Sequence, residues 1–257
     1  MTRTSWSVLT DRETVTGETV ALAGAACAGV GLLLTWVTIN STTHSGLNTD
    51  HGLIALACVG AIAAMTYYRP WGPRSIVVVL LSGITIFWLP LNYADSMFAE
   101  DLQVGILGQL FLAFGIELGT FDPIPGLEYG TGFQLTVLGG IGLAAVGLIE
   151  LRRHEVTESW KKEVLGSFAL VVFTFFMLDS GAGLLLILSF TLGWFGLLAT
   201  VYCDLQYVRK NSDWNPRSRL WLVGLAFPLL NLIIGAYYTY KRYRIGDISP
   251  QSGTNRA

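Results

Sequence analysis

Apolar runs long enough to cross a membrane recur along this chain and constrain its fold more than any other feature. The 257 residues are 52% hydrophobic and only 13% charged, whereas a soluble domain usually carries about 25% charged residues. A helix of about 20 apolar residues, rising about 1.5 Å per residue, crosses a hydrocarbon core of about 30 Å. We therefore expect an all-α, polytopic helical membrane protein in the cell membrane.

Seven runs have about this length. They cover residues 18–39, 52–68, 75–93, 131–151, 164–178, 183–202 and 220–240. A further apolar stretch, 104–118, is shorter and contains Gln109 and Glu117. The sequence therefore predicts about seven transmembrane helices and one short outer segment, 104–118, that is interfacial or re-entrant.

The placement of Lys and Arg predicts the orientation, because short cytoplasmic loops collect these residues. With seven spans and a cytoplasmic N-terminus, the outer loops 40–51, 94–130 and 179–181 contain no Lys or Arg. If 104–118 also crossed the membrane, both later basic loops would fall outside. The charge pattern therefore favours seven spans.

The C-terminal basic residues conflict with this topology. Lys241, Arg242 and Arg244 follow the seventh run and would lie outside. Either the charge rule fails at the last helix, or Pro228 breaks the last run into a re-entrant pair that returns the chain to the inside. We expect two modules: a four-span module at 1–155, with the long outer loop 94–130, and a three-span module at 156–257, with the basic inner loop 203–219.

Small residues recur in the fourth run, where Gly139, Gly140, Gly142 and Gly147 lie close together in the sequence. Small side chains let the backbones of membrane helices approach each other closely. We expect these glycines to pack against other helices of the same chain, with an interface between copies as the alternative.

The sequence lacks the residues that common membrane enzymes and cofactor proteins require. No predicted span contains a His to ligate haem, and the last run contains no Lys for a retinal Schiff base. There is no HExxH, phosphate-binding Walker loop or GxSxG motif. We expect a non-enzymatic protein without cofactor, metal site or nucleic-acid partner.

Polar residues inside the runs are the first candidates for function, because they are costly in lipid. The clearest are Asn92 and Asn231. Asn231 follows Pro228 by three residues, so its amide can satisfy backbone groups that the proline frees. The alternative is a polar site for transport.

The most charged stretch is YCDLQYVRKNSDWNPRSRLW, residues 202–221, between two apolar runs. We expect it to be an interfacial anchor that contacts lipid or a partner through four basic residues and two tryptophans: Arg209, Lys210, Arg217, Arg219, Trp214 and Trp221. Each basic residue near an anionic leaflet contributes about 1 kcal/mol. Asp204 is expected at the water edge, paired with Arg209 or Lys210 and contributing only about 0–1 kcal/mol.

The same stretch, followed by FPLLNLIIGAYYTYKRYR, resembles the C-terminal part of small multi-pass membrane proteins of haloarchaea. The resemblance covers residues 201–244 and implies an archaeal multi-pass membrane protein. It implies no activity, because that family has no established one.

These observations favour a structural, assembly or accessory subunit that contacts membrane lipid and another membrane protein or a second copy of itself. The alternative is a small-solute, lipid or ion transporter. A transporter requires a hydrated cavity lined by residues such as Thr35, Asn92 or Asn231. An accessory subunit requires a dry bundle with an interaction surface at its periphery.

Overall fold

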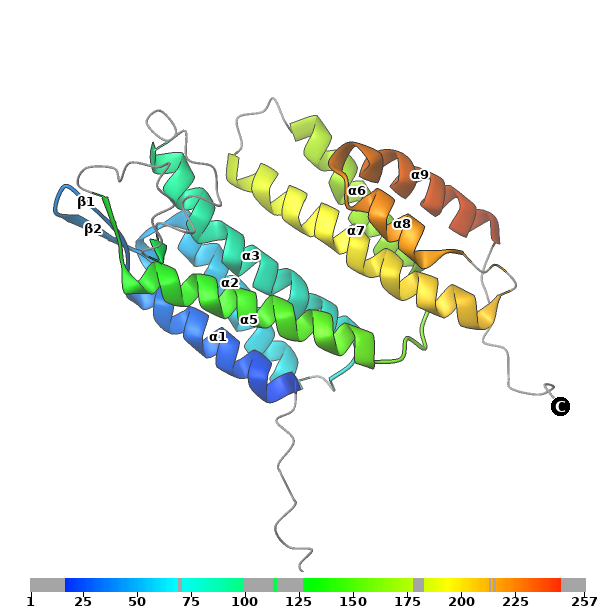
Figure 1. The fold of residues 1–257 in the computed structure, drawn as a ribbon, viewed down its shortest axis with the longest axis horizontal. Helices are drawn as coiled ribbons and strands as arrows, with labels where there is room; N and C mark the ends of the chain where they lie inside the picture. Colours follow the sequence, from blue (N-terminus) through cyan, green and yellow to red (C-terminus); the bar gives the residue numbers. More distant parts are fainter. Residues whose placement is uncertain are drawn as a thin grey trace, which may run out of the picture.

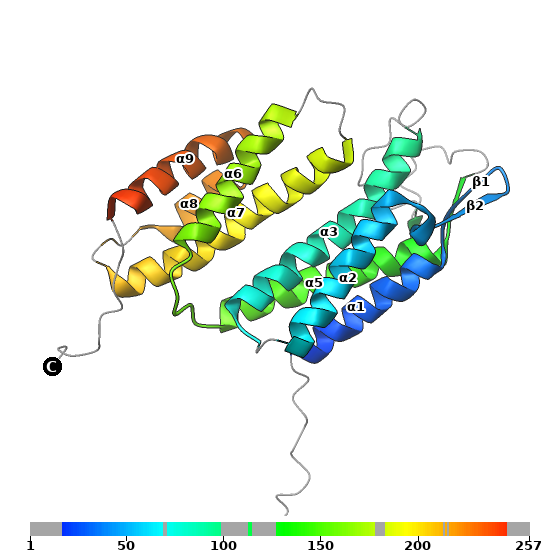
Figure 2. The same ribbon diagram turned by 180° about the vertical axis from the view of Figure 1, so that it is seen from behind.

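The computed structural model describes helices that pack into two neighbouring groups (Figures 1 and 2). The described residues are 17–68, 71–98, 113–114, 127–177, 183–212, 214 and 216–245. The first group contains α1 (Gly17–Leu33), α2 (Asp50–Tyr68), α3 (Pro73–Phe98) and α5 (Thr131–Arg153). The second contains α6 (Lys161–Met177), α7 (Gly183–Asn211), α8 (Ser218–Leu225) and α9 (Pro228–Ile245). Contacts between α3 and α7 join the groups, and the division into two modules at residue 155 stays a prediction.

Glycines of α5 allow the close packing of the first group. A Cβ atom on Gly140 would lie 2.5 Å from the backbone nitrogen of Phe87 in α3, and one on Gly139 would lie 2.7 Å from that of Ala28 in α1. Any larger residue would therefore push these helices apart. Gly142, in contrast, has no atom within 4 Å of its Cβ position. Gly139 and Gly140 thus pack inside the bundle, whereas Gly142 faces outward.

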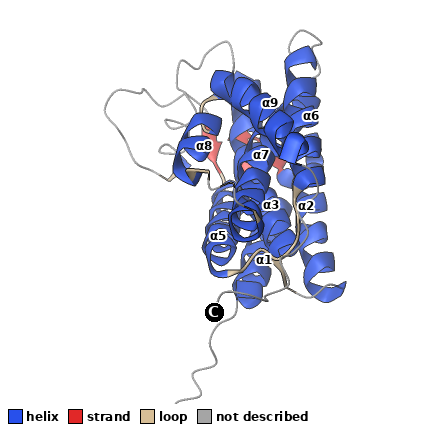
Figure 3. Ribbon diagram, turned by 90° about the vertical axis from the view of Figure 1, so that its right-hand side faces the viewer, coloured by secondary structure: helices blue, strands red, loops and turns tan. Residues whose placement is uncertain are grey.

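A three-stranded antiparallel sheet caps one end of the first group (Figures 1 and 2; its strands are red in Figure 3, behind the helices), so the all-α prediction is wrong in this detail. Its strands are β1 (Thr35–Ile39), β2 (Thr42–Ser45) and β3 (Leu127–Tyr129), in the order β2-β1-β3. The predicted span 18–39 ends as a helix at Leu33, because the β-branched sequence of β1 favours a strand. Asn40 and Ser41, with φ of 45° and 71°, form the tight turn to β2.

The predicted outer segment 104–118 lies outside the described residues, except for Ala113 and Phe114. Ala113 is buried, and its carbonyl accepts a hydrogen bond from Nε2 of Gln134 at 2.7 Å. This part of the loop 94–130 therefore packs on the first turns of α5, next to the sheet.

The prediction of seven spans is wrong. Among the described residues, four helical segments are long and apolar enough to cross a membrane: Asp50–Tyr68, Pro73–Ala94, Thr131–Arg153 and Leu188–Asn211. The helices α1 and α6 have 17 residues each, which reach about 26 Å, short of a hydrocarbon core of about 30 Å. As helices, the first and fifth predicted spans are therefore at the lower limit of the length that crosses a membrane.

The seventh predicted span is two helices rather than one. The helix α8 ends at Leu225, α9 begins at Pro228, and the two pack against each other. Arg242, near the end of α9, contacts Asp204, near the end of α7. Of the two alternatives for the last run, the structure therefore shows the break at Pro228, with α9 running back toward the end of α7 (Figure 1).

This hairpin brings the basic residues of α9 to the end of the molecule where the other described Lys and Arg lie. All Lys and Arg whose side chains are described lie at helix ends opposite the sheet: Arg74, Arg152, Arg153, Lys161, Lys162, Arg209, Lys210, Arg217, Lys241, Arg242 and Arg244. We call this the basic end and the opposite one the sheet end. The charge conflict at the last helix disappears, because α9 also finishes at the basic end.

Candidate functional site

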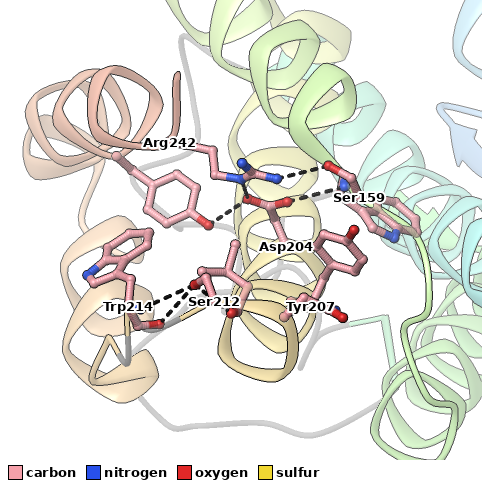
Figure 4. A network of polar contacts seen from close by, with 10 residues as sticks. Ser159, Asp204, Tyr207, Ser212, Trp214 and Arg242 are labelled. Atoms are coloured by element: carbon pink, nitrogen blue, oxygen red, sulfur yellow. Dashed lines mark hydrogen bonds and ion pairs between the residues drawn. The ribbon is translucent and has the colours of Figure 1, made fainter. Parts of the chain in front are cut away.

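Asp204, in the last turns of α7, is the centre of a buried polar network at the basic end (Figure 4). Its side chain is 0% exposed. Its Oδ2 accepts hydrogen bonds from Nε of Arg242 at 2.7 Å and from the hydroxyl of Tyr238 at 2.9 Å. Its Oδ1 accepts one from the backbone N–H of Trp160 at 3.2 Å. One carboxylate thus joins α7 to α9 and to the start of α6.

Arg242 extends this network. It is 1% exposed, and its Nη2 donates to Oγ of Ser159 at 2.9 Å. Ser159 and Trp160 directly precede α6, so Asp204 also places a negative charge at the positive end of that helix dipole. We call Asp204, Arg242, Tyr238, Ser159 and the N–H of Trp160 the Asp204 network.

Tyr238 remains a hydrogen-bond donor because its surroundings disfavour loss of the hydroxyl proton. Burial, followed by the charge of Asp204, raises the pKa of the Tyr238 hydroxyl well above its ordinary value. The phenol therefore stays protonated and donates to Asp204 throughout the physiological range. Both charges of the ion pair are withdrawn from solvent, and the partners of Asp204 belong to neighbouring helices. This arrangement is suited to holding α6, α7 and α9 together.

The predicted surface pairing of Asp204 is wrong. Arg209 is exposed, and its Nη1 lies 3.4 Å from Oγ of Ser218, whereas Lys210 pairs with Glu155 at 3.2 Å. Arg209 and Lys210 are sequence neighbours of Asp204 on α7, whereas its actual partner, Arg242, comes from α9. The sequence signal was weak: Asp204 follows the apolar run 183–202 by two residues, and a charge buried there requires an opposite charge from elsewhere in the chain.

The two predicted interfacial tryptophans lie beside the network. Trp221 stacks on Tyr237 with ring centroids 5.7 Å apart, and Trp214 contacts Trp221 edge-on at 6.1 Å. The ammonium of Lys241 lies 4.6 Å from the ring centroid of Trp214. Both tryptophans are half-buried. One part of each ring packs against the core between α7 and the hairpin of α8 and α9, and the other part is at the surface.

The other predicted contact residues lie near α8. Arg217 is exposed at the residue before α8, and Arg219 lies in the first turn of α8 with a side chain outside the described atoms. The structure thus brings Lys210 and Trp214 to the same end as the Asp204 network. The contact of this stretch with lipid or a partner stays a prediction.

The two polar candidates of the apolar runs are far apart. Asn92 lies at the sheet end, with its Oδ1 3.1 Å from Nε2 of His51. Asn231 is buried in α9, and its Nδ2 donates to the carbonyl of Leu225 at 2.7 Å. That carbonyl belongs to the last residue of α8, so the amide satisfies a backbone group next to the break at Pro228.

A cavity of about 600 Å³ lies between the two groups of helices. We call it the interhelical groove. It is lined by α3, α5, α7 and Leu222 of α8, and only Arg152 and Tyr202 contribute polar groups. The groove does not include Thr35, Asn92 or Asn231. The described residues also contain no group of three or more His, Cys, Asp or Glu that could hold a metal ion.

No family model, curated protein or solved structure matches this chain. The membrane assignment therefore depends on the four long apolar helices. The resemblance of residues 201–244 to haloarchaeal membrane proteins stays a prediction from the sequence.

Proposed function

We propose that this chain is an integral membrane protein that acts as a structural, assembly or accessory subunit. The proposal depends on one observation: the buried charged groups of the second helix group bond to each other and to neighbouring helices. Asp204 and Arg242 are 0% and 1% exposed and bond to each other, to Tyr238 and to Ser159. These groups stabilise helix packing rather than facing a substrate.

The alternative of a solute or ion transporter has less support. Such transporters place polar or ionisable groups along a pathway through the membrane. Here Asn231 bonds to the carbonyl of Leu225, Asn92 lies beside His51, and Thr35 belongs to β1. The interhelical groove, in contrast, is almost wholly apolar.

The charge distribution supports one orientation. Since the positive-inside rule places short basic segments in the cytoplasm, the basic end and the N-terminus belong inside and the sheet end outside. In this arrangement the four candidate spans cross the membrane, the shorter helices α1 and α6 connect the same two sides, and the hairpin of α8 and α9 turns back to the inside. Membrane lipid surrounds the helices, and a membrane protein or a second copy is the partner.

The test measures the size of the detergent-extracted complex and the solute or ion flux of the purified protein in liposomes. The protein, extracted in mild detergent from its own cells, should migrate as an assembly larger than the 28.0 kDa chain with its detergent. Purified and placed in liposomes, it should give no saturable solute or ion flux above that of empty liposomes. A monomeric species that catalyses such flux, with the flux reduced in Asn92→Leu or Asn231→Leu, would contradict the proposal.

A further inference from the structure

The interhelical groove has the form of a binding site for one hydrocarbon chain. Its apolar lining comes from three long helices and includes Ile84, Phe87, Ala145, Leu148 and Leu198. Its volume of about 600 Å³ lies within the range of about 300–1,000 Å³ that small ligands occupy in proteins. Leu148 is 48% exposed, so the groove is open at the surface of α5.

The groove covers the depth of one leaflet. Along α5 its lining runs from Ile141 to Arg152, a rise of about 16 Å at about 1.5 Å per residue. Half of a hydrocarbon core of about 30 Å is about 15 Å. The length of the groove therefore matches a hydrocarbon chain within one leaflet.

The polar groups of the groove lie at its basic end. Arg152 is in the last turn of α5, and Tyr202 is two residues before Asp204 on α7. Arg152 is exposed, and none of the hydrogen bonds and ion pairs found among the described residues uses its side chain. The neighbouring Arg153, in contrast, pairs with Glu150 at 3.2 Å. A guanidinium at the headgroup level of an apolar groove is complementary to a phosphate.

We propose that the interhelical groove binds an anionic phospholipid of the leaflet at the basic end, with a hydrocarbon chain between α3, α5 and α7 and the phosphate at Arg152. The inference depends on the proposed position in the membrane and specifies the class of lipid. The bound chain fills the space between the two helix groups, so it completes the packing of the protein.

The test is native mass spectrometry of the detergent-purified full chain, titrated with phosphatidylglycerol or with phosphatidylcholine of the same chains. The wild type should bind one phosphatidylglycerol with saturation and prefer it to phosphatidylcholine. Arg152→Gln should weaken this binding about fivefold, the equivalent of one basic residue at an anionic surface. Arg153→Gln, the matched loss of charge at a paired arginine, should leave it unchanged.

A second pair of variants tests the hydrocarbon part. Ala145→Phe places a ring in the groove and should remove the saturable binding, whereas Ala57→Phe, at an exposed position of α2, should not. Circular dichroism and elution volume show whether each variant is folded. If Ala145→Phe does not fold, the two arginine variants decide the question.

Three results would overturn the inference: binding that persists in folded Ala145→Phe, equal affinity for both lipids, or equal effects of the two arginine substitutions. A dimer that forms through the groove in place of lipid binding would also overturn it. The proposed function is tested separately, since an intact native assembly without lipid selectivity would refute only the lipid site.

Discussion

Asp204→Asn should destabilise this protein severely, although a carboxylate beside a basic loop is an ordinary surface feature in sequence. The substitution keeps the size of the side chain but removes the negative charge opposite Arg242, which is 1% exposed. Removing one partner of a buried ion pair costs about 3–5 kcal/mol, because the remaining charge is left uncompensated. A protein of ordinary stability, about 5–15 kcal/mol, would lose between about a fifth and all of it.

The hydrogen-bond geometry adds to this effect. The two oxygens of Asp204 face three donors: Arg242 and Tyr238 on one oxygen, and the N–H of Trp160 on the other. An asparagine has one acceptor oxygen, so its amide NH2 must face at least one of these donors. Either orientation therefore leaves a donor without its acceptor.

The assay is equilibrium unfolding of the purified protein in mixed micelles, followed by tryptophan fluorescence and circular dichroism. Glu155→Gln is the matched control, since it removes one charge from the exposed pair with Lys210 and should cost less than about 1 kcal/mol. The double variant Asp204→Leu/Arg242→Met should recover part of the stability, because it removes the uncompensated charge but leaves the Tyr238 hydroxyl and the Trp160 N–H without their acceptor. A loss for Asp204→Asn as small as that for Glu155→Gln would refute the reasoning.

Two further predictions concern helix packing. Gly140→Ala should cost about 1–3 kcal/mol by overpacking because its Cβ would lie 2.5 Å from a backbone atom of α3, whereas Gly142→Ala, with open space around it, should be neutral or stabilising in the same unfolding assay. Asn231→Leu should cost only about 1 kcal/mol, since the Leu225 carbonyl keeps its bond from Trp194 at 2.9 Å. Combining it with Trp194→Phe should cost more than the sum of the two single effects, and strict additivity would count against this shared-acceptor explanation.

The helices could be predicted from sequence to the extent that local patterns determine them. Hydropathy identifies the regions of α2, α3, α5 and α7, and Pro228 indicates the break between α8 and α9 as one of two alternatives. It does not show that the first apolar run becomes a strand at Thr35, because β-branched residues suit both a membrane helix and a strand in an apolar run.

The candidate site was less predictable for a different reason. Arg242 is 38 residues from Asp204, and their pairing depends on the direction in which α9 returns. Local spacing instead indicated Arg209 and Lys210, which lie on the same helix as Asp204. The interhelical groove likewise requires the relative placement of α3, α5 and α7, which no single segment specifies.

The most direct test of the central claim is the sidedness of three cysteine substitutions in a chain without its native cysteines. Thr43→Cys lies at the sheet end, Glu158→Cys at the basic end, and Arg244→Cys at the end of α9. We expect an impermeant maleimide to label Thr43→Cys in intact cells and the other two only after lysis. Labelling of Thr43→Cys and Glu158→Cys from the same side would contradict a membrane-crossing bundle, and labelling of Arg244→Cys together with Thr43→Cys would contradict the returning hairpin.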